Sequence, residues 1–140
     1  MNKIILCFLL AISTYGQAPP NNTGTLPEET NGLLNGRFWK AQTTAQKEIF
    51  LLGYATGSYD GALLVSARAG HDGTPVLKEL FPTGMSPAEV ALAVDRFYAT
   101  PENIRVVINA AIKIVAMRTA GADEAKIQKA TADARSSAAK

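Results

Sequence analysis

The chain contains very few of the residues that usually carry recognisable chemistry. Its 140 residues include one cysteine, one histidine and one tryptophan. The cysteine, Cys7, lies in an apolar N-terminal stretch, so the rest of the chain has no thiol for a disulfide, a nucleophile or a metal ligand. The histidine, His71, precedes Asp72 in a glycine-rich stretch, and one such dipeptide falls short of the three or four ligands of a metal site. We therefore predict no bound metal and no cofactor.

A strong charge of either sign is also missing. The 14 Lys and Arg residues nearly balance the 12 Asp and Glu residues, which gives a formal net charge of +2. This balance offers no electrostatic argument for binding nucleic acid or an anionic membrane surface. With 47% hydrophobic and 19% charged residues, the composition is that of an ordinary globular domain.

One uninterrupted apolar run stands out near the N-terminus. Residues 4–12 form it, and nine residues are too few to span a bilayer. Lys3 precedes the run and the small residues of 13–18 follow it, which is the pattern of a signal peptide. We expect residues 1–18 to be removed by cleavage after Gly16 or Ala18. The protein would then be exported to the periplasm of a Gram-negative bacterium or secreted, with no stable membrane insertion after cleavage.

The remaining chain divides by composition into three parts. Residues 19–31 are rich in proline, asparagine, threonine and glycine and are expected to form a flexible linker. Residues 32–121 carry helical patterns and form the predicted domain. Residues 122–140 are alanine-rich and polar, with Ile127 as their only large apolar side chain, so we expect a tail that is frayed or loosely helical.

The predicted fold is all-α, a compact bundle of four principal helices. They are expected over residues 30–42, from 44 to between 67 and 69, over 87–99 and over 101–119. Start signals support three of them: Thr43 with Gln46, then Ser86-Pro87 with Glu89, then Thr100-Pro101 with Glu102. Four aromatic side chains are expected to serve mainly as core: Trp39, Tyr54, Phe97 and Tyr98.

The second helix is the one around which we expect the bundle to form. It carries Gly53, Gly57 and Gly61, each about one turn apart, and glycine inside a helix costs about 1 kcal/mol relative to alanine. Close approach of another backbone would offset that cost. Asp60 lies beside the glycines on the same apolar side, so a buried partner is needed. Either Arg118 or the exposed amides of the first turn at 101–103, near Asn103, could supply it.

Two segments together resemble a known group of proteins. They are G-Y-A-T-G-S-Y-D-G at 53–61 and V-D-R-F-Y-A-T-P-E-N at 94–103, the latter followed by an apolar helix. This layout, including the turn at Pro101, is similar to small exported bacterial proteins of unassigned role and to the periplasmic immunity proteins that neutralise type VI secretion amidase effectors. The resemblance implies a helical fold and an effector as partner. The disulfide cysteines of those immunity proteins have no counterpart here.

Three classes of function follow from these observations. The first is a protein-binding module, with another protein as partner and exposed candidate contacts at Tyr59, His71, Asp72, Asp95 and Arg96. The second is an enzyme in which two of Asp60, Asp95 and Glu102 act as an acid/base pair. The third is a carrier whose pocket is lined by Trp39, Tyr54, Phe97 and Tyr98. We favour the binding module, because the sequence contains no nucleophile–base set, phosphate loop or metal-ligand cluster.

Overall fold

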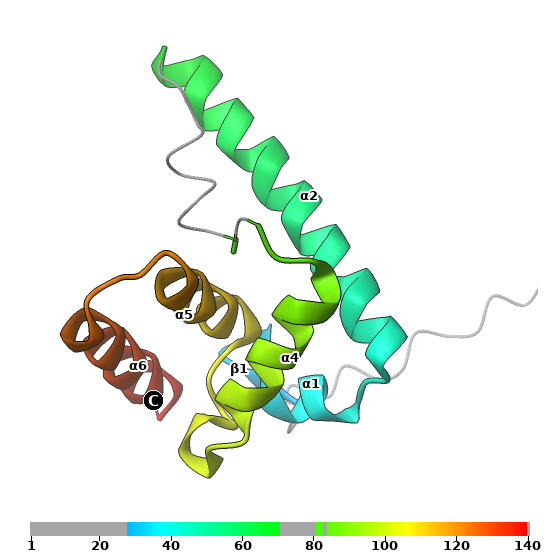
Figure 1. The fold of residues 1–140 in the computed structure, drawn as a ribbon, viewed down its shortest axis with the longest axis vertical. Helices are drawn as coiled ribbons and strands as arrows, with labels where there is room; N and C mark the ends of the chain where they lie inside the picture. The colour runs from blue at the N-terminus through cyan, green and yellow to red at the C-terminus, as the bar shows by residue number, and fades with distance from the viewer. Residues whose placement is uncertain (1–27, 71–80, 83, 140) are drawn as a thin grey trace, which may run out of the picture.

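The computed structural model describes residues 28–70, 81–82 and 84–139 (Figure 1). It begins with an antiparallel hairpin of β1 (Glu29–Thr30) and β2 (Leu33–Leu34). The helices then follow in the order α1 (Gly36–Ala41), α2 (Thr44–Ala69), α4 (Pro87–Tyr98), the 3-10 turn η1 (Pro101–Asn103), α5 (Ile108–Thr119) and α6 (Glu124–Ala138). Helices make up most of this structure, so the predicted all-α class is confirmed. The predicted signal peptide lies outside the described residues, and so do residues 19–27 of the predicted linker, His71 and Asp72.

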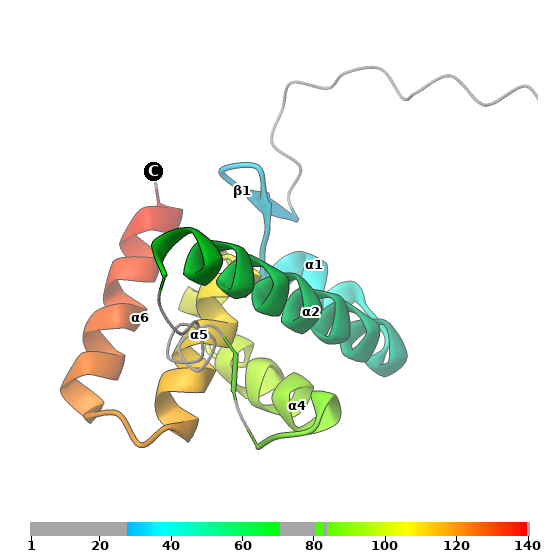
Figure 2. The same ribbon diagram turned by 90° about the horizontal axis from the view of Figure 1, so that it is seen from above.

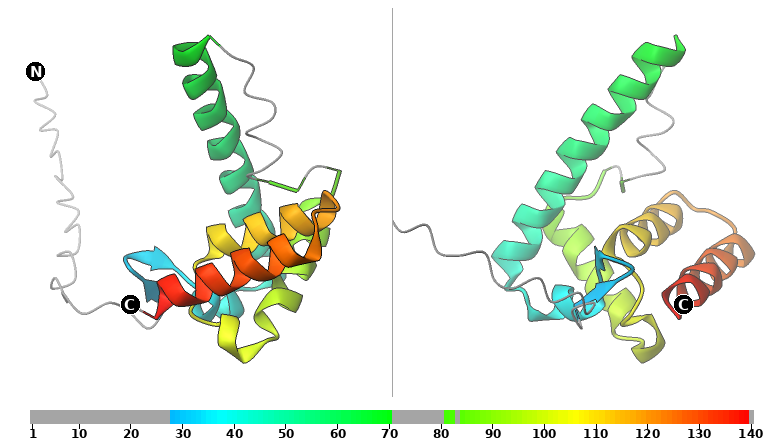
Figure 3. Two further views of the ribbon diagram at one scale, coloured as in Figure 1. Left: turned by 90° about the vertical axis from the view of Figure 1, so that its left-hand side faces the viewer. Right: turned by 180° about the vertical axis from the view of Figure 1, so that it is seen from behind.

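Helix α4, rather than α2, is the element on which the others pack. α1, α2, η1 and α5 all contact α4, and α6 packs on α5 (Figure 2). The N-terminal half of α2 crosses α4, and the C-terminal half of α2 then extends past the rest of the described helices (Figure 3). The largest fully buried apolar side chains include Trp39, Leu51, Val90, Val94, Tyr98, Val106, Ile108 and Ile112.

Local signals placed the starts of α2 and α4 correctly. Thr43 and Gln46 form the predicted capping box of α2, and Ser86 and Glu89 form that of α4. α2 ends at Ala69, and its C-cap Gly70 has a φ of 67°, in the left-handed region that glycine adopts without strain. These ends depend on contacts within four residues, which explains why the sequence alone reveals them.

The predicted first helix over residues 30–42 is wrong in its first half. Residues 29–34 form the hairpin instead, and Asn31 and Gly32 are its two-residue turn with φ values of 53° and 74°. Asn-Gly is a strong sequence signal for this turn, because both positions need positive φ. The helix starts only at Gly36, after the N-cap Asn35. The predicted linker therefore ends before Glu29, and Thr30 is buried within the fold.

The predicted fourth helix over 101–119 is also interrupted. Residues 101–103 form η1, and the regular helix α5 begins only at Ile108. Between them the chain is extended at Val107, which forms a β-bridge with Asn35, while the Arg105 carbonyl accepts a 2.7 Å hydrogen bond from the Thr30 hydroxyl. Pairing with the hairpin therefore replaces a turn of helix, and Val106 beside it is fully buried.

The C-terminal part is a regular helix and not a frayed tail. Gly121, with a φ of 71°, turns the chain after α5, and Asp123 caps α6. α6 buries Ile127 and Ala138 and packs on α5 with a face of mostly small residues. Small side chains let two helices approach closely, so little large apolar surface is needed to hold α6. The domain consequently reaches from the hairpin to Ala138.

Candidate functional site

The glycine row of α2 does not contact another backbone in the described structure. All three glycines are exposed, and a β-carbon built on any of them meets no heavy atom of a neighbouring described element within 4 Å. Asp60 beside them is exposed and forms no hydrogen bond or ion pair with any described residue, Arg118 included. The expected burial of the row and of Asp60 is therefore wrong. Among the described glycines, Gly36 makes a close approach, since a β-carbon there would lie 2.5 Å from Tyr98 Cδ1.

The glycine row is exposed because α2 has apolar side chains on more than one side, and a different side is buried. The inner side of α2 carries Leu51 and Ala62, which are buried. At about 100° per residue, Ile49, Leu52, Leu63 and Leu64 fall on the other side with Gly53 and Gly57, within an arc of about 140°. These four side chains are 70%, 55%, 49% and 63% exposed, in that order. We call them, with Gly53, Gly57 and Asp60, the outer face of α2.

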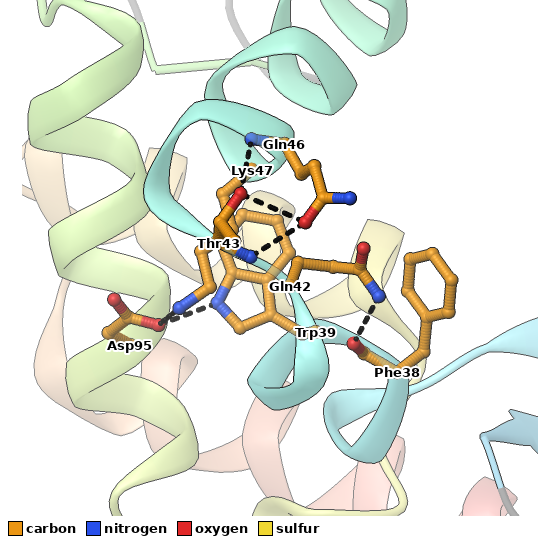
Figure 4. Close-up of polar contacts among 7 residues, drawn as sticks. All are labelled: Phe38, Trp39, Gln42, Thr43, Gln46, Lys47 and Asp95. Carbon is orange, nitrogen blue, oxygen red and sulfur yellow. Dashed lines mark hydrogen bonds and ion pairs between the residues drawn. The ribbon is translucent and has the colours of Figure 1, made fainter.

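A polar cluster holds the N-terminal half of α2 in its orientation. Asp95 Oδ1 on α4 accepts a 2.7 Å hydrogen bond from Trp39 Nε1 on α1 and pairs with Lys47 Nζ on α2 at 2.7 Å (Figure 4). The Lys47 ammonium also lies 5.5 Å from the centroid of the Trp39 ring, which is a cation–π distance. Phe50 packs edge-on against Trp39 from the next turn of α2. The cluster joins α1, α2 and α4 through one carboxylate oxygen.

This geometry changes the role assigned to Asp95. The sequence suggested an exposed binding or catalytic carboxylate, whereas the structure engages it in joining three helices. Sequence reasoning missed Lys47 because its partner is 48 residues away, with no local signal. Among the other predicted contacts, Tyr59 is exposed on α2 and Arg96 is exposed at the end of α4.

The predicted acid/base set is not brought together. Asp60 is on the middle of α2, Asp95 is in the polar cluster, and Glu102 is exposed on η1. No hydrogen bond joins any two of them in the described structure. Over these same residues, no group of three His, Cys, Asp or Glu side chains is placed to hold a metal ion.

The predicted aromatic pocket is filled core. Trp39, Phe97 and Tyr98 are buried, and Tyr54 is half-buried against Phe81 with ring centroids 6.4 Å apart. The Tyr98 hydroxyl donates to the Val106 carbonyl at 3.0 Å, and burial raises the pKa of Tyr98 far above its ordinary value. Burial also raises the pKa of Tyr54, against the smaller opposing effect of a hydrogen bond with Ser58. Both phenols thus stay neutral and structural at physiological pH.

A polar cleft of about 310 Å³ runs along α6 and is bordered by α4, η1 and α5. Phe97 and Ile127 form its apolar part, and Arg96, Arg118 and Arg135 are its basic residues. Asn103, expected in the polar core with Asp60 and Arg118, is 3% exposed and lies at this cleft. Arg118 itself is exposed. Sequence reasoning missed Arg135, because it lies in the segment expected to be frayed.

Comparisons with known proteins add no identification. The chain matches no protein-family model, no curated protein and no solved structure. The similarity to immunity proteins therefore stays a prediction. No helix within the described ranges combines the length and apolar character needed to cross a membrane.

Proposed function

We propose that this chain is an exported binding protein that recognises another protein through the outer face of α2. One observation carries the proposal: four large aliphatic side chains on one helix face are each about half or more exposed. Water-soluble domains rarely leave such side chains clustered on one side of an element, and clusters of this kind mark interaction sites. α2 also extends beyond the body, so a partner can reach this face (Figure 3).

The shape of the face favours a helix as the element that docks. Gly53 and Gly57 lie among the aliphatic side chains along the helix, and a β-carbon on either meets no heavy atom of another described element within 4 Å. A row of glycines one turn apart forms a shallow groove, and an amphipathic helix can place its backbone close to such a groove. Asp60 lies within the face and requires a donor or cation on the partner, because an unpaired buried carboxylate is unfavourable.

The available energy indicates a moderate affinity. Burying the exposed parts of Ile49, Leu52, Leu63 and Leu64 would contribute about 5 kcal/mol before the cost of association. That cost is of similar size, so polar contacts around the face must provide the remainder. A single charged substitution at the centre of the face should therefore abolish binding at micromolar concentrations.

Photocrosslinking from defined positions tests the docking surface. A photoreactive amino acid at Leu64 should capture one protein partner in cells, and the Leu52→Glu/Leu64→Glu variant should lose it. Leu92 is the matched control, since it is 51% exposed but lies on α4. Crosslinking from Leu92 should capture nothing specific, and Leu92→Glu should keep the partner. Retention of the partner by the double variant would contradict the proposal.

Self-association is the competing use of the same face. Sedimentation equilibrium of the purified protein should show a monomer at micromolar concentration. A dimer that Leu64→Glu dissociates would assign the face to a second copy of the chain and would overturn the proposed foreign partner.

Export is a separate part of the proposal and has its own test. It is supported by the apolar run at 4–12 with Lys3 before it and small residues after it. Fractionation should place the protein in the periplasm or medium with a mass that fits cleavage after Gly16 or Ala18. Full-length protein confined to the cytoplasm would refute export while leaving the docking surface open to its own test.

The resemblance to periplasmic immunity proteins suggests a more specific version of this proposal, in which the partner is a secreted amidase effector. An amidase encoded next to this chain would be the effector to test. The wild-type protein should inhibit it and the Leu52→Glu/Leu64→Glu variant should not. An unaffected amidase would remove the immunity role.

A further inference from the structure

The cleft along α6 has a polarity that the outer face of α2 does not share. Its lining residues on α6 recur every three or four positions from Glu124 to Arg135, so they form one side of that helix. At 1.5 Å per residue this side is about 16 Å long. The cleft volume of about 310 Å³ is enough for a small organic molecule.

Two arginines line this cleft together with Asn103. Asn103 Nδ2 donates to the Phe97 carbonyl at 2.7 Å, and Asn103 Oδ1 accepts from Arg135 Nε at 2.7 Å. Arg96 adjoins Phe97 on the last turn of α4 and lines the same cleft. A buried side chain thus fixes the Arg135 guanidinium through Nε, which leaves its two terminal amino groups available as donors.

Neither arginine forms an ion pair with Glu124, which lines the same cleft, or with any other carboxylate in the described ranges. The two ion pairs found there join Lys47 with Asp95 and Lys129 with Asp133. Arg96 and Arg135 each occupy the last turn of their helix, where a cation is favoured by the helix dipole. The dipole accounts for a basic residue at each helix end, but it does not account for both residues lining one cleft with Asn103 orienting one of them.

We propose that this cleft binds a small organic anion with a carboxylate or phosphate head. The head would lie between Arg96 and Arg135, because guanidinium groups pair with such oxygens through two parallel hydrogen bonds. Thr100, whose carbonyl accepts a 3.0 Å hydrogen bond from the Asn103 backbone amide, provides a lining hydroxyl beside Asn103. The less polar body of the ligand would lie along Phe97 and Ile127. This site is independent of the docking face on α2.

Calorimetric titration with four probes tests the site on the full chain. Phenyl phosphate and benzoate have a head and a body, inorganic phosphate has the head alone, and phenol has the body alone. Phenyl phosphate should bind more tightly than inorganic phosphate, and phenol should not bind. Benzoate binding as tightly as phenyl phosphate would assign the head site to carboxylates as well. Absence of heat with both phenyl phosphate and benzoate at millimolar concentration would overturn the proposal.

Matched charge removals identify the residues. Arg96→Gln and Arg135→Gln should each weaken phenyl phosphate binding about tenfold or more, as expected for a charged hydrogen bond. Arg68→Gln removes the same charge from the last turn of α2 and should leave binding unchanged. An equal loss in Arg68→Gln would mean that only net charge matters and would refute a defined site. Because Arg135 also bonds Asn103, Arg96→Gln provides the result that does not depend on folding.

Discussion

The glycines provide the sharpest test of how α2 sits on the molecule. We predict that Gly57→Ala stabilises the protein. A β-carbon at Gly57 meets no heavy atom of a neighbouring described element within 4 Å, so the added methyl group clashes with nothing there. Alanine is about 1 kcal/mol better than glycine inside a helix, because it restricts the unfolded backbone and shields the helix. For a domain of this size that gain corresponds to a rise of about 4 °C in melting temperature.

Gly36→Ala should have the opposite effect. Its β-carbon would lie 2.5 Å from Tyr98 Cδ1 and 2.9 Å from the Ile104 carbonyl oxygen. Tyr98 is fully buried and anchored through its hydroxyl, so it cannot move aside without disturbing the core. Overpacking of this kind costs about 1–3 kcal/mol, and a backbone oxygen in the clash places Gly36 at the upper end.

Thermal and urea unfolding of both variants and the wild type should show a gain in stability for Gly57→Ala and a loss for Gly36→Ala. Destabilisation of the isolated monomer by Gly57→Ala would refute the free space above α2, because some other part of the chain would then have to occupy it. The same substitution also tests the proposed docking groove. It should weaken binding of the partner while it stabilises the free protein, a combination that a merely structural glycine would not give.

Three further predictions concern contacts that hold the domain together. Asp95→Ala should lower the free energy of unfolding by about 2 kcal/mol, since Trp39 and Lys47 lose their shared acceptor. Asp95→Asn should lower it less, because the amide oxygen can still accept the hydrogen bond from Trp39. Equal losses of the two variants in urea unfolding would contradict this prediction. The hydrogen bonds with Ser86 lower the pKa of Glu89 below its ordinary value of 4.5, so the stability it adds is present above that value and is lost as the pH falls through the lower folded pKa. Between about pH 6 and about pH 3, the melting temperature should therefore fall less for Glu89→Gln than for the wild type. Identical falls in melting temperature would refute a stabilising role for the Glu89 charge. Ile127→Ala should destabilise the domain by about 2–4 kcal/mol if α6 is part of the core, whereas a change below about 0.5 kcal/mol would mean that α6 adds no stability.

The candidate sites differ in how much of them the sequence could reveal. The aliphatic outer face and the glycine groove were visible as a pattern at 49–64, but the same pattern reads equally well as buried core. Leu51, Tyr54 and Ala62 made the opposite side of α2 apolar as well, so periodicity could not choose between the two. The arginine cleft was hidden because Arg96, Asn103 and Arg135 meet only after α4, η1 and α6 pack.

Some features follow directly from short stretches of sequence. The capping boxes at Thr43 and Ser86, the stop at Gly70 and the all-α class depend on hydrogen bonds and backbone preferences within a few residues, and these are the same in any tertiary setting. The Asn31-Gly32 turn belongs with them, since positive φ at both positions was predictable from the dipeptide.

Tertiary structure decided the features that depend on which neighbouring element each segment packs against. Pairing with the hairpin opened the helix before Ile108, and close packing of small side chains on α5 ordered α6 in spite of its polarity. Contact with α4 buried Leu51 and left Leu64 in water, which placed the glycine row on the outside. A helix encodes its own ends locally, but its buried side is chosen by the shape and free energy of the partner surface, and that choice is made between segments far apart in the chain.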